Sequence, residues 1–212
     1  MNSEETSALL GELGAATLGE SGARGMPPRI RPAWPGATVA APAYPVRCTP
    51  GDNLAIHVAV TQAPAGSVLV VDVGSVPDRG YWGEVLTTGA LARGLAGLVI
   101  DGGVRDVGAL EALGFPVFST TIALPGATKF ARGAVGKPTA VAGVPVATGD
   151  WVVGDVDGVV VVPFGGLDAT VAAGRKRATA EAGYFTALRA GSTTVDLLGL
   201  DVSPIEVVSP GE

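Results

Sequence analysis

Residues 97–106 read GLVIDGGVRD, and the fold class follows from this stretch and its neighbours. A short apolar run gives way to glycines and charged residues, a pattern typical of a β-strand that is covered on both faces and ends in a loop. Residues 67–73 (SVLVVDV) show the same pattern one unit earlier, with room for a helix between the two strands. Strand, helix and strand in this order predict a parallel sheet with helices packed on it.

Apolar periodicity and turn residues predict the other elements of the chain. Helices are expected at 3–22, 53–62, 84–95, 107–113 and 166–190, and the last is followed by a tail that completes residues 166–212. Strands are expected at 38–48, 67–73, 97–100, 116–120, 139–141, 144–147, 150–153 and 158–162. Four prolines within 26–36 predict an extended strap. Pro42 and Pro45 predict that strand 38–48 lies at an edge or carries a bulge.

These elements predict one mixed α/β domain over residues 1–212. Parallel strands come first and antiparallel strands later, with helices at both ends of the chain.

Composition and charge exclude several classes of function. The net charge is −6 and the isoelectric point is near 4.8, so the surface repels phosphate backbones and a nucleic-acid partner is not expected. Cys48 is the only cysteine, which excludes an intrachain disulfide and a thiolate metal cage. The N-terminal residues are acidic where a signal peptide is basic, and no run of about 18 apolar residues occurs. We therefore expect a cytoplasmic protein with no membrane partner.

The residues most suited to chemistry follow two neighbouring strands. Arg105 and Asp106 come after strand 97–100, and Glu84 occupies the corresponding place one unit earlier, with twenty residues between Glu84 and Arg105. Adjacent parallel strands bring such loops to one edge of the sheet, where helix N-termini also point their N–H groups. Two carboxylates beside a guanidinium there can hold a hard divalent cation, because Mg²⁺ prefers oxygen ligands and keeps several waters.

Purely structural roles are open for each of these residues. Asp106 could be a helix N-cap, Arg105 a partner in a surface ion pair, and Glu84 a first-turn acid that complements the helix dipole. His57 lies on an apolar helix face, where it could equally be a core residue with satisfied hydrogen bonds. Lys129 is the sole candidate for the desolvated lysine that a Schiff-base aldolase requires.

Eight segments together resemble the family of class II aldolases for 4-hydroxy-4-methyl-2-oxoglutarate and 4-carboxy-4-hydroxy-2-oxoadipate, whose fold is shared by the regulator of ribonuclease activity A (RraA). The segments are RIRPAWPG, VRCTPGDNLAIH, VLVVDV, GYWGEVL, ARGLAGLVIDGGVRD, GFPVFS, GDWVVGDVDGVVVVP and LRAGSTTVDLLGL. They span residues from about 10 to 200. The resemblance implies an RraA-like layered αββα sandwich of the swivelling β/β/α type, with mixed central sheets and N- and C-terminal helices.

The resemblance also implies roles for individual residues. Asp106 would ligate Mg²⁺ or Mn²⁺ directly, and Arg105 would contact the keto oxygen and a carboxylate of the substrate. Glu84 stands where the aldolases usually have Asp, the acid that reaches the metal through water. Glu181 would join the water shell of the metal from a neighbouring subunit, as a third catalytic group beside Arg105 and Glu84.

The substrate pocket implied by the resemblance has two further parts. The backbone N–H groups of Gly83, Glu84, Val85 and Leu86 would receive a substrate carboxylate at a helix N-terminus. Asn53 and His57 would lie beside the pocket. Family members form trimers or pairs of trimers, so a homotrimer or homohexamer is expected.

The expected function is a metal-dependent lyase that cleaves small 4-hydroxy-2-oxo dicarboxylic or tricarboxylic acids to pyruvate. Decarboxylation of oxaloacetate passes through the same enolate and is expected as a side activity. Glu84 adds a methylene relative to Asp, which leaves the identity of the substrate open. Two alternatives remain: a non-catalytic RraA-like regulator that binds a ribonuclease, and a related lyase with a different acid substrate.

Overall fold

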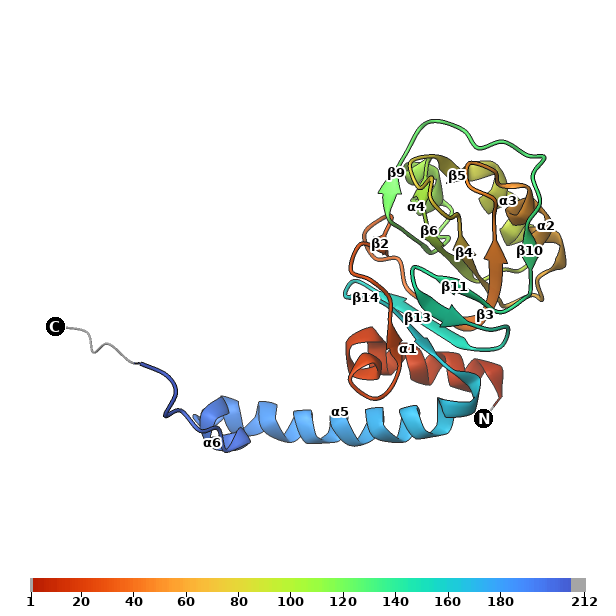
Figure 1. The fold of residues 1–212 in the computed structure, drawn as a ribbon. Helices are drawn as coiled ribbons and strands as arrows, with labels where there is room; N and C mark the ends of the chain where they lie inside the picture. Colours follow the sequence, from red (N-terminus) through yellow and green to blue (C-terminus); the bar gives the residue numbers. More distant parts are fainter. Residues whose placement is uncertain (1, 207–212) are drawn as a thin grey trace.

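The computed structural model describes residues 2–206, and within them the chain forms four layers in the order helix, sheet, sheet, helix (Figure 1). The helices are α1 (Ser3–Gly19), α2 (Leu54–Gln62), α3 (Glu84–Ala92), α4 (Val107–Ala112), α5 (Leu167–Arg189) and α6 (Thr194–Leu198), with a 3-10 turn at Phe164–Gly166. Helices α1 and α5 cover one outer face, and α2, α3 and α4 cover the other. The expected αββα sandwich is therefore confirmed.

A nine-stranded sheet supplies both sheet layers, because residues of β4 and β6 pack in one core with residues of β13 and β14. The strand order is β1–β14–β13–β3–β4–β6–β8–β2, and β10 pairs with β3. These strands are β1 (Arg24–Gly25), β2 (Arg31–Pro32), β3 (Val39–Arg47), β4 (Val68–Asp72), β6 (Gly97–Asp101), β8 (Val117–Ser119), β10 (Ala134–Val135), β13 (Trp151–Asp155) and β14 (Gly158–Val162). Strands β3, β4, β6 and β8 are parallel and the other pairings in this sheet are antiparallel. The parallel β4, β6 and β8 and the antiparallel β13 and β14 agree with the sequence prediction, whereas the two-residue strands β1, β2 and β10 do not appear in it. A separate hairpin joins β11 (Thr139–Val141) to β12 (Val144–Val146).

Alternation along the strands produces three hydrophobic cores, one for each interface between layers. On β4, Leu69 and Val71 face α2–α4, whereas Val68 and Val70 face the opposite sheet layer. On β14, Val160 and Val162 pack under α1 and α5, and Val159 and Val161 complete the middle core. A strand whose residues are buried on both faces needs an apolar residue at nearly every position, which explains the unbroken valine runs.

The expectation of an edge position for the proline-containing strand is wrong, because β3 lies between β13 and β4. Alternate residues of a strand point their N–H and C=O groups to opposite sides. The amide of Ala43 donates to Asp150 on the β13 side, so Pro42 faces the other side, where β4 begins only opposite Ala43. The carbonyl of Pro45 accepts from Gly136 next to the two-residue strand β10, so its missing N–H also faces that short neighbour. Neither proline removes a bond from the β4 ladder.

A second, small sheet lies beyond the carboxyl ends of the parallel strands and was not predicted. It consists of β5 (Gly80–Trp82), β7 (Gly103–Val104) and β9 (Thr121–Ile122), which follow β4, β6 and β8 along the chain and pair in parallel. These strands have two or three residues, too few to show a period in the sequence. Their pairing holds the loops after β5 and β7 side by side.

The terminal helices differ in detail from the expectation. Helix α1 ends at Gly19 and is interrupted at Gly14, which has φ 74°, and the Asp155 carboxylate accepts from the amide of Ala15 at 2.7 Å just after the break. The predicted tail contains α6, capped by the Thr193 hydroxyl, while its last residues, 207–212, lie outside the described part. No helix among residues 2–206 is both long and apolar enough to cross a bilayer.

Candidate functional site

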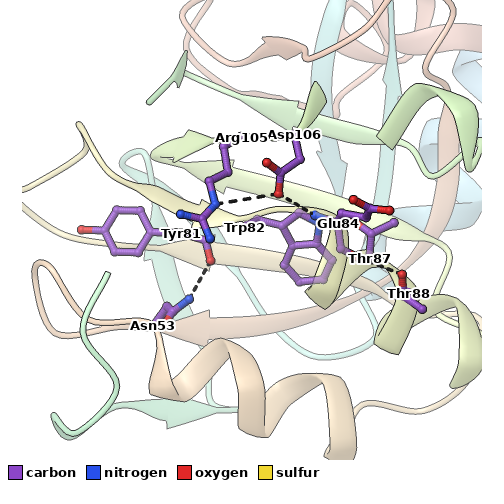
Figure 2. A network of polar contacts seen from close by, with 8 residues as sticks. All are labelled: Asn53, Tyr81, Trp82, Glu84, Thr87, Thr88, Arg105 and Asp106. Carbon is purple, nitrogen blue, oxygen red and sulfur yellow. Dashed lines mark hydrogen bonds and ion pairs between the residues drawn. The ribbon is translucent and has the colours of Figure 1, made fainter. Parts of the chain in front are cut away.

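The loops after β5 and β7 meet through direct contacts between their residues. The amide of Arg105 donates to the carbonyl of Trp82 at 2.9 Å, and the amide of Glu84 donates to Oδ2 of Asp106 at 3.1 Å. Figure 2 shows Asp106 between Arg105 on one side and Glu84 on the other. Nε of Arg105 lies 3.8 Å from Oδ2 of Asp106, so the two charges are adjacent. The side chains of Arg105 and Asp106 and the backbone amide of Glu84 therefore form one cluster.

Asp106 holds a backbone conformation that is unusual for its residue type. It precedes α4 as the N-cap residue, with φ 58° and ψ 34° in the left-handed region. Such a conformation costs about 1–3 kcal/mol and tends to persist where function requires it. Its carboxylate makes no capping bond to α4 and instead points across to the neighbouring loop. The Asp106 carboxylate therefore does not act as a side-chain N-cap of α4.

Glycine at position 83 leaves room for the close approach of the Asp106 carboxylate. A Cβ at Gly83 would lie 2.4 Å from Oδ2 of Asp106 and 3.2 Å from Cγ of Arg105. Gly80 is similarly constrained, since a Cβ there would lie 2.6 Å from the carbonyl oxygen of Ala123. Both glycines have ordinary backbone angles, so the constraint is the space occupied by the neighbouring loop.

The cluster lies at a cavity of about 180 Å³. Pockets for drug-sized ligands usually measure about 300–1,000 Å³, so this one suits a smaller molecule. The side chains of Arg105 and Asp106 are 44% and 41% exposed, which leaves both accessible from solvent. The lining residues are Asn53, His57, Gly80, Tyr81, Trp82, Gly83, Val85, Leu86, Arg105, Asp106, Gly126, Ala127 and Lys129.

Asn53 and His57 lie at this cavity, on α2 and at its N-terminus. The side-chain amide of Asn53 donates to the carbonyl of Tyr81 at 2.8 Å, and the residue is 4% exposed. Its Oδ1 atom and Nε2 of His57 are buried with no partner among the described residues. Burial lowers the pKa of His57, the charge of Lys129 lowers it further, and Asp52 opposes the shift. The imidazole is therefore neutral at pH 7, and two residues that line the cavity each carry a buried polar atom without a partner within residues 2–206.

The segment that carries Lys129 is held in place by Asp52. The Asp52 carboxylate accepts from the hydroxyl of Thr128 and the amide of Phe130, both at 2.8 Å, and from the amide of Ala131 at 3.1 Å. The sequence marks Lys129 only for Schiff-base chemistry and does not single out Asp52. Both belong to the surroundings of the site, and no local pattern in the sequence links residues so far apart.

The other two candidate acids, Glu84 and Glu181, do not line the cavity. The side chain of Glu84 is exposed and does not line the cavity, and its backbone amide is engaged by Asp106. Because first-turn N–H groups have no partner inside the helix, the amides of Val85 and Leu86 remain available at the start of α3. Glu181 lies on α5, on the opposite outer face, where its carboxylate pairs with Arg177 at 2.8 Å.

A divalent cation at this cavity would need oxygen ligands from the surrounding residues. Among residues 2–206, no three His, Cys, Asp or Glu side chains gather in a group that could hold a metal by themselves. Asp106 still fits as a single direct ligand, because it is half-exposed and one N–H donor and one guanidinium leave acceptor capacity on its carboxylate. Mg²⁺ is often held by one or two carboxylates plus waters.

Comparisons with known proteins agree with this architecture. The chain matches the family model described as RraA-like, Aldolase/RraA, over residues 3–161. A protein of Halalkalibacterium halodurans named "Putative 4-hydroxy-4-methyl-2-oxoglutarate aldolase" is 38% identical over 136 residues, which are 64% of this chain and 65% of that protein. This chain thus spans just under two thirds of the length of that relative.

Solved structures show the same fold. The crystal structure of an uncharacterized protein from Pseudomonas syringae pv. tomato has a TM-score of 0.83 at 29% identity, covering 93% of this chain and 94% of the other. RraAS2 of Streptomyces coelicolor, described as an unusual member of the RNase ES inhibitor RraA family, has a TM-score of 0.74 at 28% identity, covering 85% and 95%. The match of the family model over most of the chain, together with these structures, shows that the protein belongs to the RraA-like family.

Proposed function

We propose that this protein is a divalent-metal-dependent lyase, a class II pyruvate aldolase that cleaves 4-hydroxy-2-oxo dicarboxylic or tricarboxylic acids. The observation that carries the proposal is the Asp106 carboxylate, held in a strained conformation beside Arg105 at a small cavity and left with acceptor capacity. The similarity to a relative named as an aldolase supports the same reaction class.

Asp106 would hold Mg²⁺ or Mn²⁺ as its one direct protein ligand, with water completing the shell. A divalent cation bound there would supply a Lewis acid that polarises the 2-keto oxygen of the substrate. The class II mechanism implies this cofactor for the aldolase branch of the family.

Arg105 would stabilise the charge that appears during cleavage. When the C4 hydroxyl loses its proton, the new carbonyl forms at C4 and the electron pair of the C3–C4 bond passes to the pyruvate enolate. The negative charge would then lie on the former keto oxygen, where the guanidinium of Arg105 could reach it; within residues 2–206 this guanidinium pairs with one carboxylate, that of Asp106 at 3.8 Å. A donor that gains strength as charge develops accelerates the reaction rather than merely binding the substrate.

The start of α3 and the N-terminus of α2 would orient the substrate. The amides of Val85 and Leu86 at a helix N-terminus suit a carboxylate. Asn53 and His57 would line the wall beside the substrate. Glu84 and Glu181 would hold the water that accepts the hydroxyl proton, Glu181 being contributed by a neighbouring copy.

A homotrimer or homohexamer is part of the proposal, because Glu181 lies on the opposite face of its own chain. Exposed large apolar side chains support an additional covering subunit: Val85 lines the cavity, Leu124 and Phe130 flank the lining segment 126–129 in sequence, and the three are 83%, 79% and 81% exposed. Exposed apolar surface often marks a protein interface.

Pyruvate release from oxaloacetate provides the simplest test. We expect turnover with Mg²⁺ or Mn²⁺, none after EDTA treatment, and recovery when metal is restored. Arg105→Ala should lower kcat by about a hundredfold or more, the effect of losing one donor to a developing oxyanion. Turnover that resists EDTA, or near-normal kcat in Arg105→Ala, would contradict the assignment.

A regulatory function is the second candidate, favoured by the likeness to RraAS2 of Streptomyces coelicolor. A non-catalytic protein that binds a ribonuclease would bind it equally well with or without metal and after Asp106→Ala. Metal-dependent pyruvate release that disappears in Asp106→Ala would favour the lyase instead.

A further inference from the structure

Trp82, the last residue of β5, connects the elements that carry the candidate site. Its backbone carbonyl accepts a hydrogen bond from the amide of Arg105 at 2.9 Å. Its indole Nε1 donates to Oγ1 of Thr87 on α3 at 2.6 Å, and both side chains are buried. The indole ring also stacks on Phe115, which follows α4, with 5.8 Å between the ring centroids. One buried residue thus contacts α3, the loop after β7 and the segment after α4.

These contacts close a ring of residues (Figure 2). Three residues before Thr87, at the start of α3, the amide of Glu84 donates to Oδ2 of Asp106 at 3.1 Å. Asp106 follows Arg105 in the chain, and the amide of Arg105 returns to the carbonyl of Trp82. The indole bond differs from the other two hydrogen bonds of the ring, because both its donor and its acceptor are side-chain atoms. A substitution can therefore remove this bond and leave the backbone groups of the ring unchanged.

The place of the Asp106 carboxylate depends on where α3 begins. Within the described residues, the bond from the Glu84 amide is the one hydrogen bond that this carboxylate accepts. The backbone of Asp106 is strained, with φ 58°, and such a conformation persists only where the surrounding structure holds it. A shift of α3 would break the indole bond and leave a buried N–H and a buried hydroxyl without partners, which is costly. The indole bond therefore resists movement of the helix that holds Asp106.

We propose that Trp82 is a positioning residue, whose indole N–H holds α3 through Thr87 and thereby keeps the Asp106 carboxylate in place beside Arg105. This inference rests on the proposed function, because it takes Asp106 as the metal ligand and Arg105 as the group that stabilises the enolate. Residues that orient a metal ligand from behind typically contribute about tenfold to a hundredfold in metal affinity or activity. A displacement of about 1 Å at the reacting groups can cost about a hundredfold in rate.

Thr87→Val removes the acceptor of the indole bond and keeps nearly the same side-chain shape. We expect Mn²⁺ binding, followed by electron paramagnetic resonance, to weaken by about tenfold, and kcat for pyruvate release from oxaloacetate to fall by about tenfold. Thr87→Ser keeps a hydroxyl and should retain most of both. The matched control is Thr88→Val, the next residue of α3, whose hydroxyl donates to the Glu84 carbonyl of the same helix at 2.9 Å. This control should stay close to the wild type in both measurements.

Trp82→Phe removes the same bond from the donor side and keeps an aromatic ring against Phe115. Because two substitutions that break one bond are not additive, Thr87→Val should have little further effect in a protein that already carries Trp82→Phe. The control is Trp34→Phe, since the indole of Trp34 donates to the Phe115 carbonyl at 3.0 Å but does not line the cavity. It should lower the melting temperature without weakening Mn²⁺ binding. If Trp82→Phe does only the same, its role is structural and the proposal fails.

Hydrogen exchange of the Glu84 and Arg105 amides tests the ring without metal or substrate. Both amides donate hydrogen bonds within the ring, so they should exchange about threefold to tenfold faster in Thr87→Val, the effect of losing one hydrogen bond. Exchange at the wild-type rate in Thr87→Val, or equally fast exchange in Thr88→Val, would overturn the positioning role. If the wild-type protein binds no Mn²⁺ and releases no pyruvate, the lyase assignment fails, while the exchange rates still decide whether the indole bond holds the ring.

Discussion

Two loops near the same cavity carry an aspartate each, and they use it in opposite ways. Asp52 precedes α2, is 2% exposed, and its carboxylate accepts four hydrogen bonds, from the amides of residues 54, 130 and 131 and the hydroxyl of Thr128. Asp106 precedes α4, its side chain is 41% exposed, and its carboxylate accepts a single hydrogen bond at 3.1 Å. Both are aspartates just before a helix, Asp106 as the N-cap residue of α4 and Asp52 one residue before Asn53, the N-cap residue of α2.

The difference lies in how much acceptor capacity each carboxylate has left. A carboxylate offers about four lone-pair sites, so Asp52 is saturated by the protein and serves the fold. Asp106 is held in position by one amide while the rest of its capacity faces the cavity and solvent. A saturated carboxylate stabilises the structure, whereas an unsaturated one in a strained backbone is suited to a ligand.

Asp106→Asn tests the functional half of this contrast and should have the largest effect. Asn tolerates the left-handed conformation and has nearly the same shape, so the fold should be kept. Loss of a negatively charged metal ligand should lower kcat/KM by about a thousandfold, which corresponds to several kcal/mol of transition-state stabilisation. Mn²⁺ binding followed by electron paramagnetic resonance, together with pyruvate release, measures both effects. Full activity in this variant would remove Asp106 from the site.

Gly83→Ala tests whether the close contact between the loops matters. The added Cβ would lie 2.4 Å from Oδ2 of Asp106, so that flexible carboxylate must move by about 1 Å. A displacement of this size can cost about a hundredfold in rate. The matched control is Gly108→Ala on α4, where a Cβ meets nothing within 4 Å. We expect normal kcat in the control and similar melting temperatures in both variants, and equal activities would show that the position of Asp106 is not critical.

The sequence alone does not show how many hydrogen bonds the carboxylates of Asp52 and Asp106 accept. The sequence predicts the parallel strands, the helices and the meeting of the Glu84 and Asp106 loops, because these depend on periodicity and on the general geometry of α/β sheets. The number of hydrogen bonds that Asp52 accepts depends on residues 128–131, which are distant in the chain. The three short strands β5, β7 and β9 are likewise fixed by tertiary pairing and not by local pattern.

The wrong prediction of an edge position for β3 has a similar cause. Pro42 and Pro45 would each remove a hydrogen bond from a ladder, but the side on which that bond falls depends on which neighbour is present there. The sequence gives no indication that β13 and β4 pair with different halves of β3. The place of Lys129 at the cavity is missed for the same reason as the contacts of Asp52, since it depends on a loop that is distant in the chain from α2.

Asp52→Asn tests the structural half of the contrast through stability. Replacing the carboxylate puts an amide group against buried donors, which should lower the free energy of unfolding by about 2–3 kcal/mol. Urea unfolding at pH 7 measures this loss. Asp78→Asn provides the control, because Asp78 is exposed and makes no side-chain hydrogen bond within the described residues. A loss in Asp52→Asn no larger than that in the control would contradict the structural role.

The same variant should change how stability depends on pH. Burial raises the pKa of Asp52, but hydrogen bonds from the Phe130, Leu54 and Ala131 amides and the Thr128 hydroxyl outweigh it and bring the pKa to about 2. A folded-state pKa below the ordinary 3.8 contributes stability that is present above that value and is lost as the pH falls toward 2. The difference between wild type and Asp52→Asn should therefore be constant from pH 7 to about pH 5 and shrink at lower pH. A difference that does not shrink would mean that the charge is not what stabilises the loop.

The smallest expected effect is on the pKa of His57, which responds to Asp52 and to Lys129 on the segment that Asp52 holds. His57 is the single histidine of the chain, so one imidazole resonance reports its titration without ambiguity. Burial lowers its pKa, Lys129 lowers it further, and Asp52 raises it. Lys129→Gln should therefore move the pKa upward and Asp52→Asn should move it downward, with the wild-type value between them and below 6.5. Opposite shifts of the His57 pKa would show that the charges of Lys129 and Asp52 both act on the imidazole. Shifts of the same sign would mean that the substitutions rearrange the loop.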